Sequence, residues 1–506
     1  MNRSTEKQII LTTLNARYMH SAFGLRYLYA NLGELQSKAC IREFSIQQRP
    51  IDIAEKLLKY SPRIIGFGVY IWNVAEITKT VALLKQIAPD TVIVLGGPEV
   101  SHLPDKPAVV DLADYVVMGA AEESFRVLCE LVLTGDQPLQ REIHSDELPL
   151  DQIQMPYQYY TDEDIKNRLI YVEASRGCPF KCEFCLSSLD KTSKPFELDP
   201  FLDEMDKLHQ RGARNFKFID RTFNLKVSSS IAILEFFLQR MSGDLYLHFE
   251  LVPDNVPDRL KAVIAEFPQH TLQFEIGVQT FDEKIQALIS RRQDNTKTRD
   301  NLRWLRENTR AYIHADLIFG LPSDTLVNFA DSFNHLVSLK PHEIQLGILK
   351  RLRGAPLDRH TEEYQLRFNP EPPYNILCTR DIDFETMQRV SRFARYWDMI
   401  ANSGRFKNTL PLILGNNPFE NFMRLSDRLY QKAGCTWNIS LRRLFVLLFE
   451  SLVAVEDIEE DRLFEKMKTD YARTGEKSSF ELLLNNENRL SRVGVANKRQ
   501  QNMLKM

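Results

Sequence analysis

Three cysteines with close, regular spacing are the residues of this chain best suited to chemistry. Cys178, Cys182 and Cys185 form the pattern C-x3-C-x2-C within the segment EASRGCPFKCEFCLSS, residues 173–188. Structural zinc normally has four protein ligands in a closed tetrahedron, and the sequence nearby offers no obvious fourth Cys or His. Three thiolates on one short loop suit a [4Fe–4S] cluster, whose remaining iron is free for an exogenous ligand. A zinc-bound scaffold is the alternative interpretation.

The composition is that of a soluble globular protein with several domains. The chain has 506 residues, of which 43% are hydrophobic and 26% charged, and its net charge is −3. Acidic and basic residues are mixed along the chain, which gives no electrostatic case for nucleic acid. Its apolar runs are too short to span a membrane. We expect a cytoplasmic protein, in which clustered thiols bind metal rather than form disulfides.

The first part of the chain, residues 1–135, has the pattern of a doubly wound, Rossmann-like α/β domain. Apolar runs such as RIIGFGVYI and TVIVLGGPEV alternate with amphipathic helix patterns such as VAEITKTVALLKQI. Buried strands that alternate with helices indicate a parallel sheet. Ligands of such sheets bind outside the carboxyl ends of the strands. Here those ends read LNARYMHS, GVYIWN and GGPEVS.

The remaining chain divides into three further segments. Residues 136–168 contain Pro138, Pro149 and Pro156 and are expected to form a linker. Residues 169–360 repeat strand and helix patterns six times, which predicts a partial (β/α)6 barrel with its site at the carboxyl ends of the strands. The three cysteines follow the first of these strands. Residues 361–506 lose the strand signal and are expected to form a helical C-terminal domain.

The cysteine segment resembles the signature of the radical S-adenosylmethionine (SAM) superfamily. That signature is C-x3-C-x2-C with an aromatic residue just before the third cysteine, the place of Phe184. The resemblance implies a radical SAM barrel whose three cysteines hold a [4Fe–4S] cluster, with SAM bound at the open iron. Reductive cleavage of SAM would then give a 5′-deoxyadenosyl radical, with electrons from an external donor such as flavodoxin or ferredoxin.

Further segments resemble parts of the same superfamily. KFIDRTFN follows the second barrel strand and makes Asp220 the expected catalytic residue, although the usual glycine pair is missing. HFELVPD places Glu250 at the end of the third strand. FEIGVQTFD and ADLIFGLP resemble oxygen-independent coproporphyrinogen oxidases and methylthiotransferases, which makes Gln279 and Asp316 expected cofactor contacts. Asp220, Glu250 and Asp316 have helix capping or ion pairing as alternative roles.

A doubly wound domain before a radical SAM barrel resembles the cobalamin-binding arrangement. The glycine pair after the strand TVIVL fits this resemblance, although plain turn chemistry also explains it, and Ala120 and Ala121 interrupt the usual GEGE wording of the next segment. Glycines at a strand end let a large ring approach the backbone. The expected cobalamin contacts are Asn15, Arg17, His20, Tyr70, Gly96, Gly97, Pro98, Glu99 and Gly119.

His20 departs from the cobalt-binding pattern of many cobalamin modules. That pattern is D-x-H-x-x-G, but here Tyr18 replaces the aspartate and Gly24 comes one residue too late. The carboxylate that would orient the imidazole is therefore missing. We expect His20 to be a polar contact of the loop rather than the cobalt ligand.

The resemblance implies a cobalamin-dependent radical SAM enzyme. By analogy with the family, the expected reaction is methylation of an unactivated carbon of a small molecule, with methylcobalamin as the methyl donor. A radical rearrangement such as ring contraction is the alternative within the class. A cobalamin-binding sensor with an inactive barrel is an alternative of another class. No segment identifies the substrate.

Overall fold

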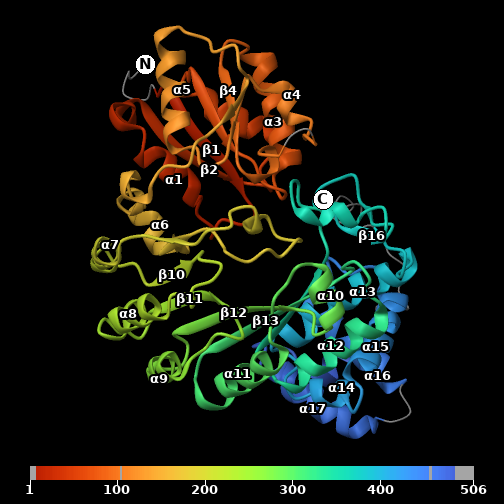
Figure 1. Ribbon diagram of the computed structural model, residues 1–506. Coiled ribbons are helices and arrows are strands. Elements are labelled where there is room, and N and C mark those ends of the chain that lie inside the picture. The colour runs from red at the N-terminus through yellow and green to blue at the C-terminus, as the bar shows by residue number, and fades with distance from the viewer. Residues whose placement is uncertain (1–6, 103–104, 455–457, 485–506) are drawn as a thin grey trace, which may run out of the picture.

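A computed structural model describes residues 7–102, 105–454 and 458–484. It contains an N-terminal α/β domain, a half-open barrel and a C-terminal group of helices that packs beside the barrel (Figure 1). The expected fold class is confirmed. The last part of the expected C-terminal domain, residues 485–506, lies outside the described residues. None of the described helices is long and apolar enough to cross a membrane.

The N-terminal domain is one parallel sheet with helices on both faces. Its strands lie in the order β2-β1-β3-β4-β5-β6. The order reverses at β1, so the carboxyl ends of β1 and its neighbour β3 form the crevice in which such sheets bind ligands. The strands are β1 (Ile9–Asn15), β2 (Ala39–Ser45), β3 (Ile64–Gly68), β4 (Val92–Gly96), β5 (Tyr115–Met118) and β6 (Glu142–His144).

Two hydrophobic cores hold the helices on this sheet. One core joins one face to α2 (Pro50–Leu58), α3 (Val74–Ile87) and α4 (Val109–Leu112). The other joins the opposite face to α1 (Phe23–Ala30) and α5 (Glu122–Thr134). Because both faces are covered, the central strands are buried along nearly their whole length, which explains their continuous apolar runs.

Strand β6 corrects the expected linker. Residues 142–144 pair in parallel with β5 and extend the N-terminal sheet, although they fall within the segment 136–168. The strand has only three residues, two of them exposed, and lies at the edge of the sheet. It therefore lacks the apolar run by which a buried strand is recognised in a sequence.

The barrel sheet is parallel and open. Its strands lie in the order β14-β13-β12-β11-β10-β7, and the described residues show no pairing between the edge strands β7 and β14. The strands are β7 (Ile170–Val172), β10 (Asn215–Phe218), β11 (Tyr246–Leu251), β12 (Leu272–Gln279), β13 (Tyr312–Phe319) and β14 (Glu343–Ile348). Each coincides with one of the six strand patterns predicted for residues 169–360.

Alternation along β12 and β13 separates the core from the inside of the barrel. Every second residue is buried against the helices, and those between are half-buried. Because successive side chains of a strand point to opposite faces, Gln279 and Asp316 lie on the inner face. The covering helices are α7 (Leu198–Gln210), α8 (Val227–Leu238), α9 (Asp258–Glu266), α10 (Glu283–Leu288), α11 (Asn295–Asn308) and α12 (Leu326–Ser338).

The C-terminal region is mainly helical, as expected. It begins with a short hairpin of β15 (Arg367–Phe368) and β16 (Ile376–Cys378). Its helices share the large hydrophobic core of the barrel, with aromatic contacts between α12 and this region such as Phe333 to Trp397. The helices are α13 (Phe384–Trp397), α14 (Leu410–Leu414), α15 (Pro418–Ala433), α16 (Leu441–Val453) and α17 (Glu460–Ala472).

Candidate functional site

The cysteine loop, defined here as residues 177–188, lies beyond the end of β7. It begins at Gly177, whose φ is +90° and whose Cβ, if present, would lie 2.3 Å from Asp190 Oδ2. Only glycine fits this turn without strain. Beyond it, Cys178, Cys182 and Cys185 all line one cavity of about 250 Å³. No three His, Cys, Asp or Glu side chains in the described ranges are arranged to hold a single metal ion.

The opposite wall of this cavity comes from the ends of the barrel strands. Glu250, Gln279 and Asp316 belong to this wall, and Phe184 lines the cavity from the cysteine loop. All four were expected at the site. Gln279 has φ +69° and lies at a bulge in the pairing of β12 with β13. A positive φ in a residue other than glycine stores strain, which is a feature of functional sites.

Two buried oxygen atoms at this cavity have no hydrogen-bond partner among the described residues. They are Gln279 Oε1 and Asp316 Oδ1. Asp316 Oδ1 lies 3.1 Å from His314 Nε2, but that contact is an ion pair without the direction of a hydrogen bond. Burial raises the pKa of the Asp316 carboxyl. Buried acceptors without donors are costly, and both atoms are placed to accept hydrogen bonds from a ligand.

Two arginines approach the cysteine loop, and neither of them was an expected site residue. Arg291 Nη1 lies 3.7 Å from Cys182 Sγ, and its other nitrogen donates to the Gly277 carbonyl oxygen. Arg291 follows α10, more than a hundred residues after the cysteines, and no local pattern in the sequence marks it. Arg221 follows β10 and forms an ion pair of 2.8 Å with Glu250.

A second, larger cavity of about 840 Å³ lies between the N-terminal domain and the barrel. One wall of this cavity comes from strand ends of the N-terminal sheet. The opposite wall includes Tyr171 and Ser175 at the start of the barrel. Six of the residues expected to contact cobalamin line it: Asn15, His20, Tyr70, Gly96, Gly97 and Gly119.

Gly97 shows why this wall lacks side chains. Its φ is +104°, and a Cβ there would lie 2.5 Å from the Val69 carbonyl oxygen. The turn after β4 therefore accepts only glycine. The backbone around it stays open to the cavity.

The two cavities adjoin. Ser187 and Arg221 line both of them. The strand ends of both sheets therefore face cavities that share part of their wall, so ligands of the two cavities would be neighbours.

Three residues expected at the larger cavity do not line it. Arg17 is exposed on the loop after β1, and Pro98 begins a short 3-10 helix that turns away. Glu99 is buried, but its carboxylate pairs with Arg353 at 2.9 Å. The sequence places these residues beside the right strand ends, but side chains next to one another along a loop point in different directions.

His20 contacts a tyrosine rather than a carboxylate. Its Nδ1 lies 2.8 Å from the hydroxyl oxygen of Tyr171 on β7. Burial lowers the pKa of the His20 imidazole, so it is neutral at physiological pH. This partner lies in the other domain, so the contact helps to join the two walls of the cavity.

Asp220 lines neither cavity. Its carboxylate accepts hydrogen bonds from Ala174 N at 3.0 Å and Ser175 Oγ at 2.6 Å. Burial raises the pKa of this carboxyl to about 7. These contacts fix the segment that leads from β7 into the cysteine loop, so the geometry favours a positioning role over the expected catalytic one.

Arg176 links the cysteine loop to the N-terminal domain. One nitrogen lies 2.8 Å from Glu122 Oε1 on α5 and another 2.8 Å from Glu173 Oε1. Both carboxylates are almost fully buried. Through these contacts, Glu173 and Arg176 brace the start of the cysteine loop against the N-terminal domain.

Family comparisons agree with the two cavities. Residues 172–336 match the radical SAM superfamily, and residues 9–129 match the B12 binding domain. The chain thus contains a radical SAM domain preceded by a B12-binding domain. This confirms the resemblance inferred from the cysteine segment and the strand ends. Residues 362–505 match a family described only as a protein of unknown function, DUF4080.

Curated relatives of this radical SAM protein include methyltransferases. The cobalamin-dependent radical SAM methyltransferase TokK of Streptomyces tokunonensis is 25% identical over 379 residues, which cover 65% of this chain and 53% of TokK. An uncharacterized methyltransferase of Pyrococcus horikoshii is 25% identical over 236 residues, 42% of this chain and 50% of the relative. The chain thus spans about half the length of the curated relatives it matches.

Solved structures share the fold. OxsB, a cobalamin-dependent SAM radical enzyme with aqua-cobalamin bound, superposes with a TM-score of 0.62 at 15% identity, covering 94% of this chain and 85% of OxsB. The methyltransferase TsrM from Kitasatospora setae has a TM-score of 0.59 at 15% identity, covering 83% of this chain and 99% of TsrM. At this identity, the likeness establishes the architecture of the B12-binding and radical SAM domains.

Proposed function

We propose that the chain is a cobalamin-dependent radical SAM enzyme that methylates an unactivated carbon of a small molecule. The observation that carries the proposal is the junction of the two cavities at Ser187 and Arg221. A methyl carrier and a radical source can act on one carbon only if their sites open into a common space. The methyltransferases among the relatives support this reaction class.

The smaller cavity fits an iron–sulfur cluster and SAM. Three cysteine thiols face it, and three thiolates leave one iron of a [4Fe–4S] cluster open. Gln279 Oε1 and Asp316 Oδ1 lack donors, and the ammonium and hydroxyl groups of SAM are donors. When bound, the cluster supplies the electron for reductive cleavage of SAM. Phe184 and the barrel wall keep water from the reacting atoms.

The larger cavity fits a wide, flat ligand such as the corrin ring of cobalamin. Glycines at three strand ends, Gly68, Gly96 and Gly119, leave backbone rather than side chains on its wall. When bound, cobalamin supplies a carrier for the methyl group. The chain holds its edges through polar groups such as Asn15 and Tyr70. His20, which lines this cavity, would contact the bound group as a polar side chain, because no aspartate at position 18 orients its imidazole as a metal ligand.

Arg221 is the cationic group of this chain where the two cavities join. Its guanidinium pairs with Glu250, yet 54% of its side chain is accessible. It can therefore keep the ion pair and still donate a hydrogen bond to a ligand in either cavity. In this reaction, we assign it the orientation of groups between the two sites.

The reaction also needs a source of electrons and a reducing compartment. Reductive cleavage of SAM needs an external one-electron donor, for which a flavodoxin or a ferredoxin is suited. We place the enzyme in the cytoplasm, where the thiols of the cysteine loop stay reduced until they bind iron. The substrate is a small molecule.

Anaerobic reconstitution distinguishes this function from its alternatives. The protein would receive iron, sulfide, cobalamin and SAM, then a reductant and a metabolite extract. Methylation yields 5′-deoxyadenosine together with S-adenosylhomocysteine and a product heavier by one methylene. A rearrangement yields the first without the second. A sensor binds cobalamin and yields neither, and a zinc scaffold binds no iron. Either of these last two results would refute the proposal.

A further inference from the structure

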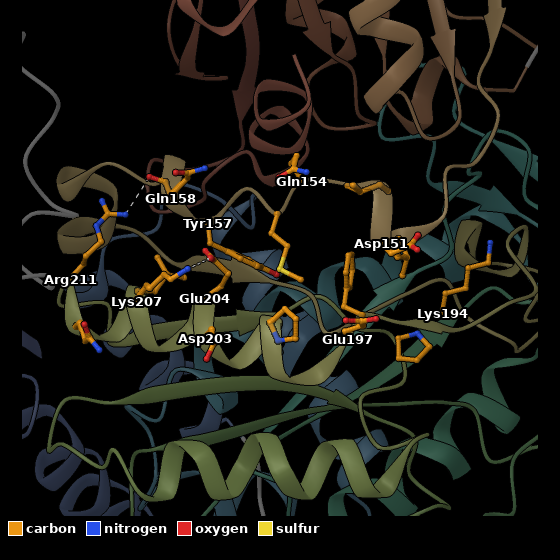
Figure 2. Close-up of a pocket in the computed structure, with 18 residues that line it drawn as sticks. Asp151, Gln154, Tyr157, Gln158, Lys194, Glu197, Asp203, Glu204, Lys207 and Arg211 are labelled. Carbon is orange, nitrogen blue, oxygen red and sulfur yellow. Dashed lines mark hydrogen bonds and ion pairs between the residues drawn. The ribbon is translucent and has the colours of Figure 1, made fainter. Parts of the chain in front are cut away.

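The groove shown in Figure 2 has a larger volume than either cofactor cavity, but among the described residues none of its basic side chains is free for an anionic ligand. It has a volume of about 1200 Å³ and lies between residues 150–158 and α7. Its basic side chains are all engaged: Lys207 with Glu204, Lys194 with Glu147 and Arg211 with Asp162. A stronger inference comes from one segment on the other side of the barrel.

This segment, here named the strap, comprises residues 349–360. It leaves the last barrel strand, β14, and ends in the 3-10 helix Pro356–His360, just before the region that matches the family of unknown function. We infer that the strap is a positioning element that fixes the two cofactor cavities relative to each other. The inference deepens the proposed function and rests on it.

One end of the strap holds the loop that follows β4. Arg353 Nε lies 2.9 Å from Glu99 Oε1, and these side chains are only 10% and 4% exposed. Arg353 also donates to the Asp105 carbonyl oxygen at 3.0 Å. Glu99 directly follows the segment 96–98, which gives the larger cavity Gly96 and Gly97. A buried carboxylate depends on its partner, so Arg353 holds this wall of the cavity in place.

Gly354, next to Arg353 in the strap, packs directly against the His102 ring of the N-terminal domain. Gly354 has φ +83°, and a Cβ there would lie 2.2 Å from the ring of His102. The strap therefore lies flat against the N-terminal domain where Arg353 reaches Glu99. Any other residue at this position would have to adopt a strained φ and displace either the His102 ring or the strap.

The other end of the strap holds the cysteine loop. Glu183 lies between Cys182 and Cys185, and its side chain is 5% exposed. Arg359 Nε donates to Glu183 Oε2 at 2.8 Å, and His360 Nε2 lies 2.8 Å from the same oxygen. Strap and loop are also joined through the backbone, because Leu357 N donates to the Glu183 carbonyl oxygen at 3.0 Å.

The C-terminal region contacts the strap through Tyr374 and Ile376. Tyr374 accepts a hydrogen bond from Arg353 through its hydroxyl at 3.1 Å and another from Arg351 N through its carbonyl oxygen at 3.0 Å. Ile376 N, in β16, donates to the Leu349 carbonyl oxygen at 2.8 Å. This assigns a task to the start of the region of unknown function, which is to hold the strap against both cavities.

The test measures each cofactor by itself. Arg353→Met should weaken cobalamin binding about tenfold or more, because a buried carboxylate loses its charged donor, while iron content stays unchanged. Arg359→Met should change the electron paramagnetic resonance spectrum of the reduced cluster and leave cobalamin affinity unchanged. Arg389→Met is the control, because Arg389 forms an ion pair of 2.7 Å with Asp427 that joins α13 to α15 and involves no residue of the strap. It should alter neither property.

Two further variants separate positioning from stability. Arg353→Lys keeps the charge and should bind cobalamin with an affinity between those of the wild type and Arg353→Met. Glu99→Gln combined with Arg353→Met removes the unpaired charge and should restore much of the affinity. If Arg353→Met binds cobalamin like the wild type and Arg359→Met leaves the electron paramagnetic resonance spectrum of the cluster unchanged, the inference is wrong, even if both variants have a lower thermal midpoint. A wild type that binds neither cofactor would overturn the proposed function, and this inference with it.

Discussion

Arg221 and Glu250 form an ion pair of 2.8 Å between neighbouring strand ends, and Arg221 lines both cavities. The Glu250 side chain is 18% exposed, and its burial raises the pKa of its carboxyl. The pair keeps a charged carboxylate at the smaller cavity and a cation at the junction. The first prediction follows from this shared position.

Arg221→Met should weaken the binding of both SAM and cobalamin. Loss of a hydrogen bond to a charged group costs about 1.5–3 kcal/mol, or roughly ten- to hundredfold in affinity. Titration calorimetry with SAM and spectral titration with cobalamin measure the two effects. Arg240→Met is the control, since Arg240 pairs with Asp206 on the outer helices at 2.7 Å. Unchanged affinities in Arg221→Met would remove Arg221 from both sites.

Replacing Cys178, Cys182 or Cys185 of the cysteine loop with alanine should abolish reductive cleavage of SAM. The cluster would lose one of its three thiolates, and no fourth cysteine of the described chain lines that cavity. Iron analysis and the yield of 5′-deoxyadenosine provide the measurement. The other four cysteines serve as controls: Cys40, Cys129, Cys378 and Cys435. If the triple variant kept its iron and its activity, the cluster would lie elsewhere.

Gln279→Ala and Asp316→Ala should each weaken SAM binding by roughly ten- to hundredfold, because each variant lacks a protein oxygen that accepts a hydrogen bond from the ligand. Glu250→Ala should do the same. Gln273→Ala is the matched control. Gln273 lies on the same inner face of β12 as Gln279, but it pairs with Tyr246 and does not line the cavity. Equal SAM affinity in all four variants would contradict the assigned site.

The cob(II)alamin form should show no nitrogen splitting in its electron paramagnetic resonance spectrum. An axial imidazole would split each cobalt line into a triplet, but His20 lacks the aspartate of the D-x-H-x-x-G pattern, and its Nδ1 contacts the Tyr171 hydroxyl in place of that carboxylate. His20→Ala should therefore give the same line pattern as the wild type. Triplets that disappear in His20→Ala would identify His20 as the cobalt ligand.

Asp220→Asn should flatten the pH dependence of stability. The pKa of this carboxyl is about 7 in the folded chain, above its ordinary value of 3.8. The folded state therefore binds more protons than the unfolded state between these values, and the wild type loses stability as pH rises from about 4 to 7. Asparagine stays neutral, so the variant should gain up to about 4 kcal/mol over the wild type at pH 8 relative to pH 4.

Urea unfolding of both proteins at pH 4 and pH 8 measures this difference. The same variant bears on catalysis, because an essential acid or base at position 220 would make it inactive at any pH. A positioning carboxylate replaced by asparagine keeps an acceptor for Ala174 N and should retain SAM cleavage. A pH-independent difference in stability would refute the pKa argument.

The buried strands could be predicted from the sequence because their signal is local. Each of the six strand patterns predicted for residues 169–360 is a strand of the barrel sheet, and the cysteines come after the first of them. The glycines of the larger cavity could also be placed, because Gly96 and Gly97 end such a run. β6 was missed because an exposed edge strand of three residues has no apolar run to detect.

The contacts of individual side chains could not be predicted in this way. Glu99 adjoins the glycine pair, but its direction is set by Arg353, which follows it by 254 residues. Arg291 reaches Cys182 only because the barrel closes around the loop. Asp220 ends the expected strand but accepts hydrogen bonds from the chain before the cysteines. Such partners are set by tertiary folding, which leaves no periodic pattern.

The pair of Glu99 and Arg353 also has a consequence for synthesis of the chain on the ribosome. The first domain can form its sheet soon after residue 144 has emerged, but the buried carboxylate of Glu99 has no partner until Arg353 follows. At about 5–20 residues per second, the 254 residues between them take roughly 13–50 s to make. Until then, the nascent first domain carries an unfinished wall, so cobalamin is best loaded after translation has passed the barrel.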